Sequence, residues 1–308
     1  MVLNANPSFD TTVLVDNIRS SGILRGKEVY KYVDGKGMGV SRTLMKLGNN
    51  DYKCLNILGG YTGEAVFKFA TKEGLKVQAF WISQETRINT ILLSEKNDTL
   101  VINEPGPALT SKEISEFKEW LRSSLNASRS NDVDYFVISG SFPRGFNSED
   151  FDEVLSIADD CGYNVVVDIA KTFLNIALKH GVWLVKVNEY EIAEISNNAI
   201  DPISFVQREY GVKNVVITTG SKGSFGNVRG IPFKTTISNP EKRYAVGSGD
   251  AYLGGLIHGI STKIGILNAV RLATACGAAN TEKIGPCIFD KEHIKIWLDR
   301  TKVEEVIM

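Results

Sequence analysis

The segment with the strongest chemical signal spans residues 245–251 and reads Ala-Val-Gly-Ser-Gly-Asp-Ala. Gly247 and Gly249 flank Ser248 where a loop is expected to enter a helix, so backbone N–H groups can converge and the helix dipole adds positive partial charge. This combination predicts an anion hole that would fit a phosphoryl group. Asp250 falls in the first helical turn, where its carboxylate could accept or orient a hydroxyl proton. The alternative is a helix start that Asp250 merely caps.

A second glycine-rich segment places Lys36 between Gly35 and Gly37. With no side chains on either neighbour, the ammonium could approach a phosphate closely, and the helix expected next would offer further N–H donors. Arg87 and Asn89 open a later predicted strand, and the guanidinium could hold a phosphate through two hydrogen bonds. A solvated lysine in a turn and a surface ion pair are the alternatives. Neither segment fits a P-loop, and the chain has no Rossmann glycine pattern.

Polar residues also follow several predicted strands, at the ends where ligands gather in open α/β sheets. Ser139 comes directly after one such strand, and Lys186 lies near the end of another. Asn188 and Glu191 are three apart and hence on one helical face, where they could hold a hydrated Mg²⁺ near phosphates or simply cap the helix. A third strand is followed by hydroxyls and glycines that could frame a nucleotide or form a tight turn: Thr219, Gly220, Ser221, Lys222 and Gly223.

The elements that would position these residues alternate along the chain. Short runs rich in β-branched residues predict strands at residues 134–138, 164–167, 183–187 and 214–217. Amphipathic patterns predict helices at residues 39–47, 62–72, 110–125, 148–158, 172–179, 189–195 and 203–210, and Thr110 with Glu113 predicts a capping box at the start of the third. Nearly continuous apolar strands between helices are typical of strands buried on both faces. The pattern therefore predicts an α/β fold built on a mostly parallel sheet.

Two stretches break this alternation in the first third of the chain. We expect two pairs of antiparallel strands here. The first pair comprises residues 11–15 and 28–33, and the second comprises residues 87–93 and 99–102, with a turn at residues 95–98. We therefore expect one α/β domain over residues 1–308, with strands of a small β lid inserted at about residues 10–36 and 86–103.

Composition excludes several classes of protein. The 308 residues carry 35 Lys+Arg against 36 Asp+Glu, a net charge of −1, so neither nucleic acid nor an anionic membrane is the expected partner. No apolar run approaches the roughly 20 residues that span a bilayer, and no signal peptide is evident, which favours a cytoplasmic protein. Four scattered cysteines predict reduced, buried thiols. Three histidines argue against a zinc hydrolase or a His-based triad.

Taken together and in order, these segments resemble the ribokinase-like PfkB family of sugar kinases over residues 6–285. The matching patterns are Asn-Pro-x-x-Asp at residues 6–10, Asp-Gly-Lys-Gly at 34–37, Ser-Gly-Ser-x-Pro-x-Gly at 139–145, Lys-x-Asn-x-x-Glu at 186–191 and Gly-x-Gly-Asp at 247–250. Thr-Arg-x-Asn at residues 86–89, with Glu-Pro-Gly-Pro at 104–107, is similar to the 1-phosphofructokinase and tagatose-6-phosphate kinase branch. Several motifs that agree in order are far more specific than any one of them.

The resemblance implies a doubly wound α/β sheet with a small β lid, and an ATP- and Mg²⁺-dependent kinase that phosphorylates a ketohexose monophosphate to a bisphosphate. Asp250 would be the base, and the amides of residues 247–249 would stabilise the transferring group. The resemblance also implies that Asp10 binds sugar hydroxyls, that Gly35, Gly37, Asn89 and Ser139 surround the substrate, and that Lys36 and Arg87 hold the substrate phosphate. Lys186, Asn188 and Glu191 would contact the metal and the ATP phosphates. The residues implied around the nucleotide are Thr219, Gly220, Ser221, Lys222, Gly223, Gly249 and Asn280. Lids of this branch often pair, so the apolar strand at residues 88–93 suits a homodimer.

The chain departs from the branch pattern at four places. Gly39 stands where a sugar-binding Asn is usual, Asp34 replaces the first glycine of the lysine segment, and Ser248 replaces Ala. Asp168 is not followed by the usual Thr-Ser-Gly. These departures bear on the identity of the sugar more than on the reaction. The alternatives are a kinase of the same family for an unphosphorylated sugar or nucleoside, a non-catalytic sugar-phosphate sensor, and an α/β scaffold without a small-molecule site.

Overall fold

The computed structural model describes residues 1–95, 98–130, 134–169, 171–238 and 244–306. The main body is a 10-stranded sheet in the order β14-β13-β12-β11-β10-β9-β8-β1-β4-β5. Its strands are β1 (Val2–Asn4), β4 (Cys54–Gly59), β5 (Val77–Ile82), β8 (Tyr135–Ser139), β9 (Asn164–Asp168), β10 (Leu184–Asn188), β11 (Asn214–Thr218), β12 (Gly223–Val228), β13 (Ile231–Thr236) and β14 (Lys302–Glu305). Every neighbouring pair from β5 to β11 is parallel, and the pairs from β11 to β14 are antiparallel. The predicted mostly parallel α/β sheet is therefore confirmed.

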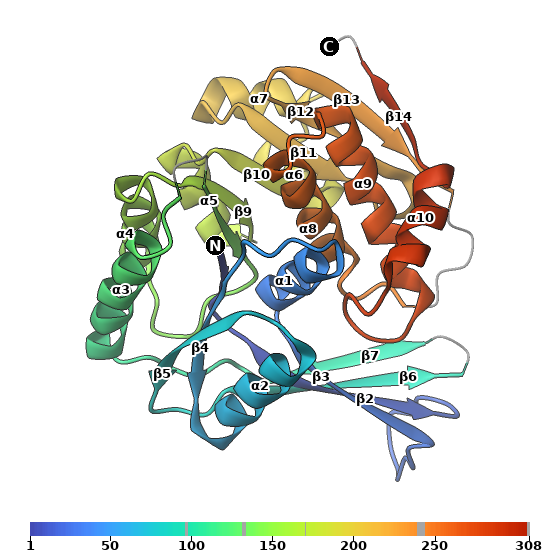
Figure 1. Cartoon of the computed structure of the whole chain (residues 1–308). Coiled ribbons are helices and arrows are strands. Elements are labelled where there is room, and N and C mark those ends of the chain that lie inside the picture. Colours follow the sequence, from blue (N-terminus) through green and yellow to red (C-terminus); the bar gives the residue numbers. More distant parts are fainter. Residues whose placement is uncertain (96–97, 131–133, 170, 239–243, 307–308) are drawn as a thin grey trace.

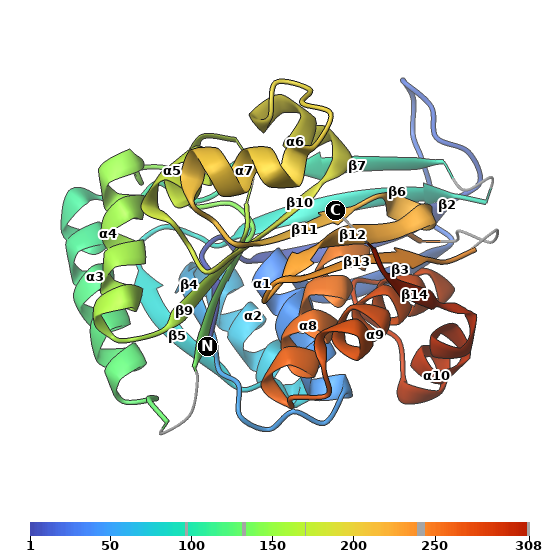
Figure 2. The same ribbon diagram turned by 90° about the horizontal axis from the view of Figure 1, so that it is seen from above.

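Helices cover both faces of this sheet, as Figures 1 and 2 show. One face carries α3 (Ser111–Asn126), α4 (Ser148–Asp160), α5 (Lys171–His180), α6 (Glu189–Ile195) and α7 (Pro202–Tyr210). The other carries α1 (Lys36–Lys46), α2 (Gly60–Glu73), α8 (Ser248–Ser261) and α9 (Ile266–Ala279), with α10 (Lys291–Arg300) packed on α9. Because strand side chains alternate, Val165 and Val167 join one core while Val166 joins the other. This double burial explains the continuous apolar strands in the sequence.

A separate four-stranded sheet lies beside the body, below it in Figure 1, in the order β3-β2-β6-β7. Its strands are β2 (Ser8–Val15), β3 (Glu28–Asp34), β6 (Arg87–Ser94) and β7 (Thr99–Asn103). Both predicted antiparallel pairs are present, β2 with β3 and β6 with β7. The pairs are joined by a parallel contact between β2 and β6, which local patterns did not predict. The predicted turn at residues 95–98 includes residues 96–97, which lie outside the described residues.

A local signal in the sequence matches the structure at the start of α3. Thr110 and Glu113 form the predicted reciprocal cap of α3, with Glu113 N–H donating to Thr110 Oγ1 over 3.2 Å and Thr110 N–H donating to Glu113 Oε2 over 2.9 Å.

The four cysteines are free and buried, as expected. Within the described ranges, no helix is both long and apolar enough to cross a membrane.

Candidate active site

The site lies where the parallel strands β8, β9 and β10 end. Asp168 is the last residue of β9, and its carbonyl accepts a hydrogen bond from the Gly140 N–H that follows β8. Lys186 lies two residues before the end of β10. Strand carboxyl ends meet at one edge of the sheet, so side chains from separate motifs converge there.

The Asp168 carboxylate is held between two ammonium groups. Lys186 Nζ lies 2.7 Å from Asp168 Oδ2, and both side chains are buried. Lys36 Nζ, about half exposed, lies 3.2 Å from Asp168 Oδ1. Burial acts to raise the pKa of Asp168, but Lys186 and Lys36 outweigh it and lower this pKa to about 2. Asp168 therefore stays ionised and holds the two cations in place.

Asp250 lies in the first turn of α8 and is only 7% exposed. Burial raises its pKa to about 7, against the opposing pull of Lys36 and Lys186. A Cβ added at Gly39 would lie 2.9 Å from Asp250 Cβ, so α1 approaches this carboxylate directly. A Cβ added at Gly249 would lie 3.3 Å from Lys186 Nζ, which places that ammonium against the loop. The motifs around residues 36, 186 and 250 thus form one cluster.

The glycine loop before α8 has the backbone conformation that the sequence predicts. Gly247 caps the helix with φ of 87°, in the left-handed region that favours glycine. The Ser248 N–H donates to Ala245 O over 3.2 Å, so this amide is used within the loop. N–H groups in the first turn of a helix have no partner inside the helix, which leaves Gly249 suited to an anion. Of the three predicted hole amides, that of Ser248 is thus already bonded to a carbonyl.

Asn280, which the resemblance assigned to the nucleotide, lies under this loop and is 1% exposed. Its Nδ2 donates to Val246 O over 2.8 Å and to Ser248 Oγ over 3.0 Å. Its Oδ1 accepts the Cys287 N–H over 2.7 Å. The amide therefore braces the loop from below.

The lid residues meet through the parallel pairing of β2 with β6, which sets Ser8 opposite Arg87 and Asp10 opposite Asn89. Asn89 Nδ2 donates to Asp10 Oδ1 and to Ser8 Oγ, each over 2.9 Å. Arg87 Nη2 donates to Asn6 O over 3.1 Å. These predicted substrate residues are thus neighbours, although about 80 positions separate them in the chain.

Several buried polar atoms on this side have no hydrogen-bond partner among the described residues. They are Asn6 Oδ1, Asp34 Oδ1, Arg87 Nε, Asn89 Oδ1 and Ser139 Oγ. Burial and the neighbouring Asp10 raise the pKa of Asp34 well above its usual range, and the same carboxyl also experiences Asp250. Buried polar groups are nearly always hydrogen-bonded in folded proteins, so such a set is typical of a site for a polar ligand.

The residues assigned to metal and nucleotide lie at the ends of β10 and β11. Asn188 and Glu191 form the cap of α6: Asn188 Oδ1 accepts the N–H groups of Tyr190 and Glu191, and Glu191 Oε2 accepts the Asn188 N–H. Thr219 Oγ1 donates to Gly223 O over 3.0 Å across the short helix Gly220–Lys222, which includes Ser221. Within the described part of the chain, no three His, Cys, Asp or Glu side chains are grouped closely enough to hold a metal. A divalent cation here would need phosphate oxygens as well as Glu191.

Comparison with known proteins decides the family. Residues 5–293 match the pfkB family carbohydrate kinases. The chain belongs to this family. The match covers the motifs at both ends of the site, from Asp10 to Asp250. The protein is therefore a phosphotransferase with an alcohol acceptor, and the family implies that ATP is the donor.

Relatives of this kinase match it over nearly their full length. The 1-phosphofructokinase of Bacillus subtilis is 27% identical over 288 residues, which cover 91% of this chain and 92% of that protein. The tagatose-6-phosphate kinase of Staphylococcus epidermidis is 26% identical, with 96% and 99% covered. The crystal structure of Escherichia coli phosphofructokinase-2 in complex with fructose-6-phosphate superimposes with a TM-score of 0.85 at 22% identity, covering 97% of this chain and 99% of that one, and so shares the fold.

Two polar residues of the kinase site had no role in the sequence interpretation. No sequence motif assigns a role to Asp168, yet it joins Lys36 to Lys186. Its position at the carboxyl end of an apolar strand is a signal that could have found it. Asp34 was noted only as a replacement for glycine, and its burial beside Asp10 depends on the pairing of β2 with β3.

Proposed function

We propose that this kinase transfers the γ-phosphoryl group of ATP to a hydroxyl of a ketohexose monophosphate, giving a bisphosphate. One observation carries the proposal. The buried Asp250 belongs to the same cluster as Lys36, Lys186 and the glycine loop, and several buried polar atoms of the neighbouring motifs have no hydrogen-bond partner among the described residues. Relatives named 1-phosphofructokinase and tagatose-6-phosphate kinase support the substrate class.

In the proposed mechanism Asp250 accepts the proton of the attacking hydroxyl. Its pKa of about 7 suits a base that is ionised at neutral pH and still able to take a proton. The amides of Gly247 and Gly249 would receive negative charge on the transferring group, and Ser248 would hold the loop in shape. Lys186, fixed by Asp168, adds positive charge beside the same loop. Such preorganised charge is the main source of catalysis in phosphoryl transfer.

At the acceptor end, Asp10 and Asn89 would bind sugar hydroxyls, and Gly35, Gly37 and Ser139 would border the sugar. Lys36 and Arg87 would hold the phosphate already on the substrate. Arg87 is the first residue of the lid strand β6 and donates to Asn6 O, so the cation lies at the lid end of the site. A guanidinium and an ammonium together match the charge of a phosphate monoester.

At the donor end, the nucleotide would lie along residues 219–223 and beneath Asn188. Mg²⁺, when bound with ATP, would neutralise charge on the phosphates and would be held by phosphate oxygens, water and Glu191. The capping bond uses Glu191 Oε2, so contact with a cation would involve the other carboxylate oxygen or a bridging water. Asn280 would act on the nucleotide through the loop it braces.

The lid is also proposed as the contact in a homodimer. All five residues of the edge strand β7 are exposed, and three consecutive apolar ones, Leu100, Val101 and Ile102, are 44%, 44% and 53% exposed. Ile88 on β6 is 39% exposed. An exposed apolar edge strand is usually covered in solution, because it would otherwise pair with other chains.

A second candidate is a kinase of an unphosphorylated sugar, which one observation favours. Asp34 adds a second carboxyl beside Asp10, where the family pattern has glycine. Because burial and Asp10 raise the pKa of Asp34, its carboxyl can donate a hydrogen bond as well as accept one, and such a pair of carboxyls suits sugar hydroxyls.

An ADP-release assay with fructose 1-phosphate, fructose 6-phosphate, tagatose 6-phosphate, fructose and ribose tests the proposal. We expect turnover with one of the sugar phosphates and none with Asp250→Asn. Arg87→Ala should raise the KM for the sugar phosphate at least about tenfold. Arg122→Ala, which removes an exposed ion pair with Asp160, is the matched control. If the enzyme preferred fructose or ribose and Arg87→Ala had an unchanged KM, the second candidate would be favoured. If no substrate led to ATP consumption, the protein would bind sugar phosphates without catalysing transfer.

A further inference from the structure

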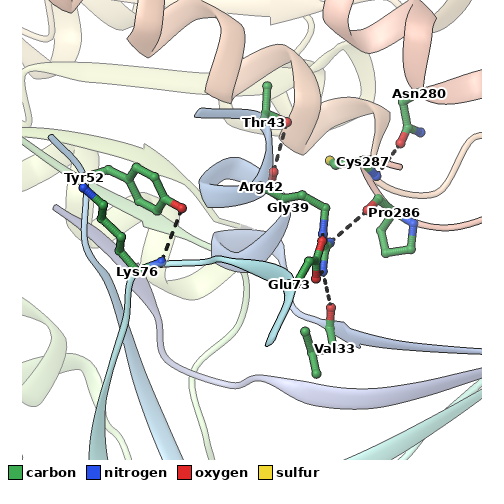
Figure 3. Close-up of polar contacts among 10 residues, drawn as sticks. All are labelled: Val33, Gly39, Arg42, Thr43, Tyr52, Glu73, Lys76, Asn280, Pro286 and Cys287. Carbon is green, nitrogen blue, oxygen red and sulfur yellow. Dashed lines mark hydrogen bonds and ion pairs between the residues drawn. The ribbon is translucent and has the colours of Figure 1, made fainter. Parts of the chain in front are cut away.

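Arg42 is a fully buried cation in α1 that the proposed mechanism does not use. Its side chain is 0% exposed, and its guanidinium contacts three separate parts of the chain, as Figure 3 shows. Nη1 donates to Pro286 O over 2.9 Å, and Nη2 donates to Val33 O over 2.8 Å. Glu73 at the end of α2 pairs with Nε and Nη2, the latter over 3.0 Å. A charge buried this completely is expensive unless it is fully bonded, as it is here.

The Pro286 contact leads directly to the glycine loop. A Cβ added at Gly247 would lie 3.1 Å from both Cα and Cβ of Pro286, so the proline packs on the loop residue itself. The next residue, Cys287, donates its N–H to Asn280 Oδ1 and its Sγ–H to Gly247 O over 3.5 Å. Arg42 therefore holds the segment on which the loop rests, and Figure 3 shows its bond to Pro286 O.

The Val33 contact leads to the acceptor end. Val33 is the residue before Asp34 in the lid strand β3, and Gly35 and Lys36 follow. The same Nη2 atom that bonds Val33 O also bonds Glu73. One guanidinium thus ties the start of the lysine segment to the support of the glycine loop.

Arginine is suited to this task because its fork is planar and its donors have fixed directions. Two carbonyl oxygens and one carboxylate, each from a different part of the chain, accept hydrogen bonds along those directions. A lysine ammonium carries the same charge but cannot reach three acceptors in a plane. Small displacements of reacting groups are costly in catalysis, since about 1 Å can lower a rate about a hundredfold.

We propose that Arg42 is a positioning residue that keeps the lysine segment and the glycine loop in register for phosphoryl transfer. This inference rests on the proposed function, because it assigns the two segments to the two ends of one reaction. Glu73 supplies the counter-charge that keeps the guanidinium in place. Arg42 itself touches neither substrate.

The test compares Arg42→Lys with Arg271→Lys. Arg271 also donates to two backbone carbonyls, Thr301 O over 3.2 Å and Leu298 O over 2.8 Å, but it joins α9 to the end of α10. We expect Arg42→Lys to lower kcat at least about tenfold, with each KM changed less than about threefold. Arg271→Lys should keep kcat within about twofold of wild type, because its bonds lie away from the glycine loop and the lysine segment.

A binding measurement separates positioning from general loss of structure. ADP with aluminium fluoride mimics the phosphoryl group in transfer and needs no acceptor. Arg42→Lys should weaken its binding at least about tenfold and leave the Kd for ADP alone unchanged. Equal kcat and equal binding of the mimic in Arg42→Lys and wild type would overturn the inference. A wild-type protein inactive on every acceptor would overturn the proposed function instead, and the mimic would still decide the role of Arg42.

A second variant covers the case in which Arg42→Lys does not fold. Pro286→Gly leaves Arg42 intact but removes the Cβ that packs on Gly247. Like Arg42→Lys, it should lower kcat and weaken the binding of ADP with aluminium fluoride. Wild-type values for Pro286→Gly would count against a supporting role for this segment and hence against the inference.

Discussion

At the scale of single residues, Asp250 is governed by two opposing effects. Its burial favours the neutral acid, while the nearby Lys36 and Lys186 favour the carboxylate. Burial prevails, and the pKa is about 7. The same residue is thereby a suitable base near neutral pH and a source of instability when ionised.

The activity should therefore depend on pH through Asp250. We expect kcat/KM of the wild type to rise about tenfold per pH unit below the pKa of about 7 and to level off above it, because only the carboxylate accepts the proton. Initial rates between pH 5 and pH 9 at constant ionic strength measure this. A flat profile over that range would contradict the assignment of Asp250 as base.

The raised pKa of Asp250 should also make the folded protein less stable as the pH rises. Between the ordinary pKa of 3.8 and the folded value of about 7, the folded protein keeps a proton that the unfolded chain has lost. Wild-type stability therefore falls as pH rises through this window, and Asp250→Asn lacks that loss. From pH 5 to pH 8, the free energy of unfolding of Asp250→Asn relative to wild type should increase by roughly 2–3 kcal/mol.

Urea titrations at the two pH values measure the difference. Asp299→Asn, at an exposed position of α10, is the control and should show no such change. If the free energy of unfolding of Asp250→Asn differed from that of wild type by the same amount at both pH values, the pKa of the Asp250 carboxyl would not be raised as described.

At the scale of elements, the position of Asp250 depends on how closely α8 approaches α1. A Cβ added at Gly254 would lie 2.6 Å from Thr43 Cβ and 2.9 Å from Val40 O. One helical turn earlier, Asp250 meets Gly39 on the same helix α1. Small residues on facing helices therefore bring the carboxylate to the site.

Substituting Gly254 should separate these helices. In Gly254→Ala the overpacking should outweigh the gain in helix propensity and lower the free energy of unfolding by about 1–2 kcal/mol. Because α8 carries Asp250, kcat should fall as well. Thermal unfolding and ADP release measure both effects, and Ser261→Ala, exposed at the end of the same helix, should change neither. An unaltered kcat in Gly254→Ala would mean that the helix spacing does not control the carboxylate.

At the scale of the whole molecule, the lid contributes to both the proposed acceptor site and the proposed dimer. Its buried face supplies Asp10 and Asn89, while its edge strand β7 is exposed along its length. A lid that pairs with a second copy would be held firmly over its own substrate. Assembly and substrate binding would then depend on the same four strands.

Charge placed on this edge should abolish the dimer. We expect the wild type to have twice the chain mass of 33.9 kDa in solution, and Ile88→Lys/Ile102→Lys to have the mass of one chain. Light scattering after gel filtration measures this. Ile200→Lys, which is fully exposed outside the lid, should leave the mass unchanged. A wild type with the mass of one chain, or a variant with the mass of two, would contradict the lid contact.

Sequence alone determined the features that depend on neighbours in the chain. Nearly continuous apolar runs between helices predicted the mostly parallel sheet, Thr110 and Glu113 predicted a cap, and the order of the glycine segments indicated the family. Strands and caps are local patterns of burial or hydrogen bonding, so a short window of residues is enough to reveal them, whereas the family is indicated by the order of several such windows along the chain.

Only the tertiary structure decided which distant residues meet. The parallel contact of β2 with β6 joins Asp10 to Asn89, Asp168 joins Lys36 to Lys186, and Arg42 joins the lid to the glycine loop. These contacts link positions far apart in the chain, and the choice of partner depends on the register of whole sheets and the packing of whole helices. No local pattern contains that information, because the stability of such a contact is set by elements that arrive from elsewhere in the fold.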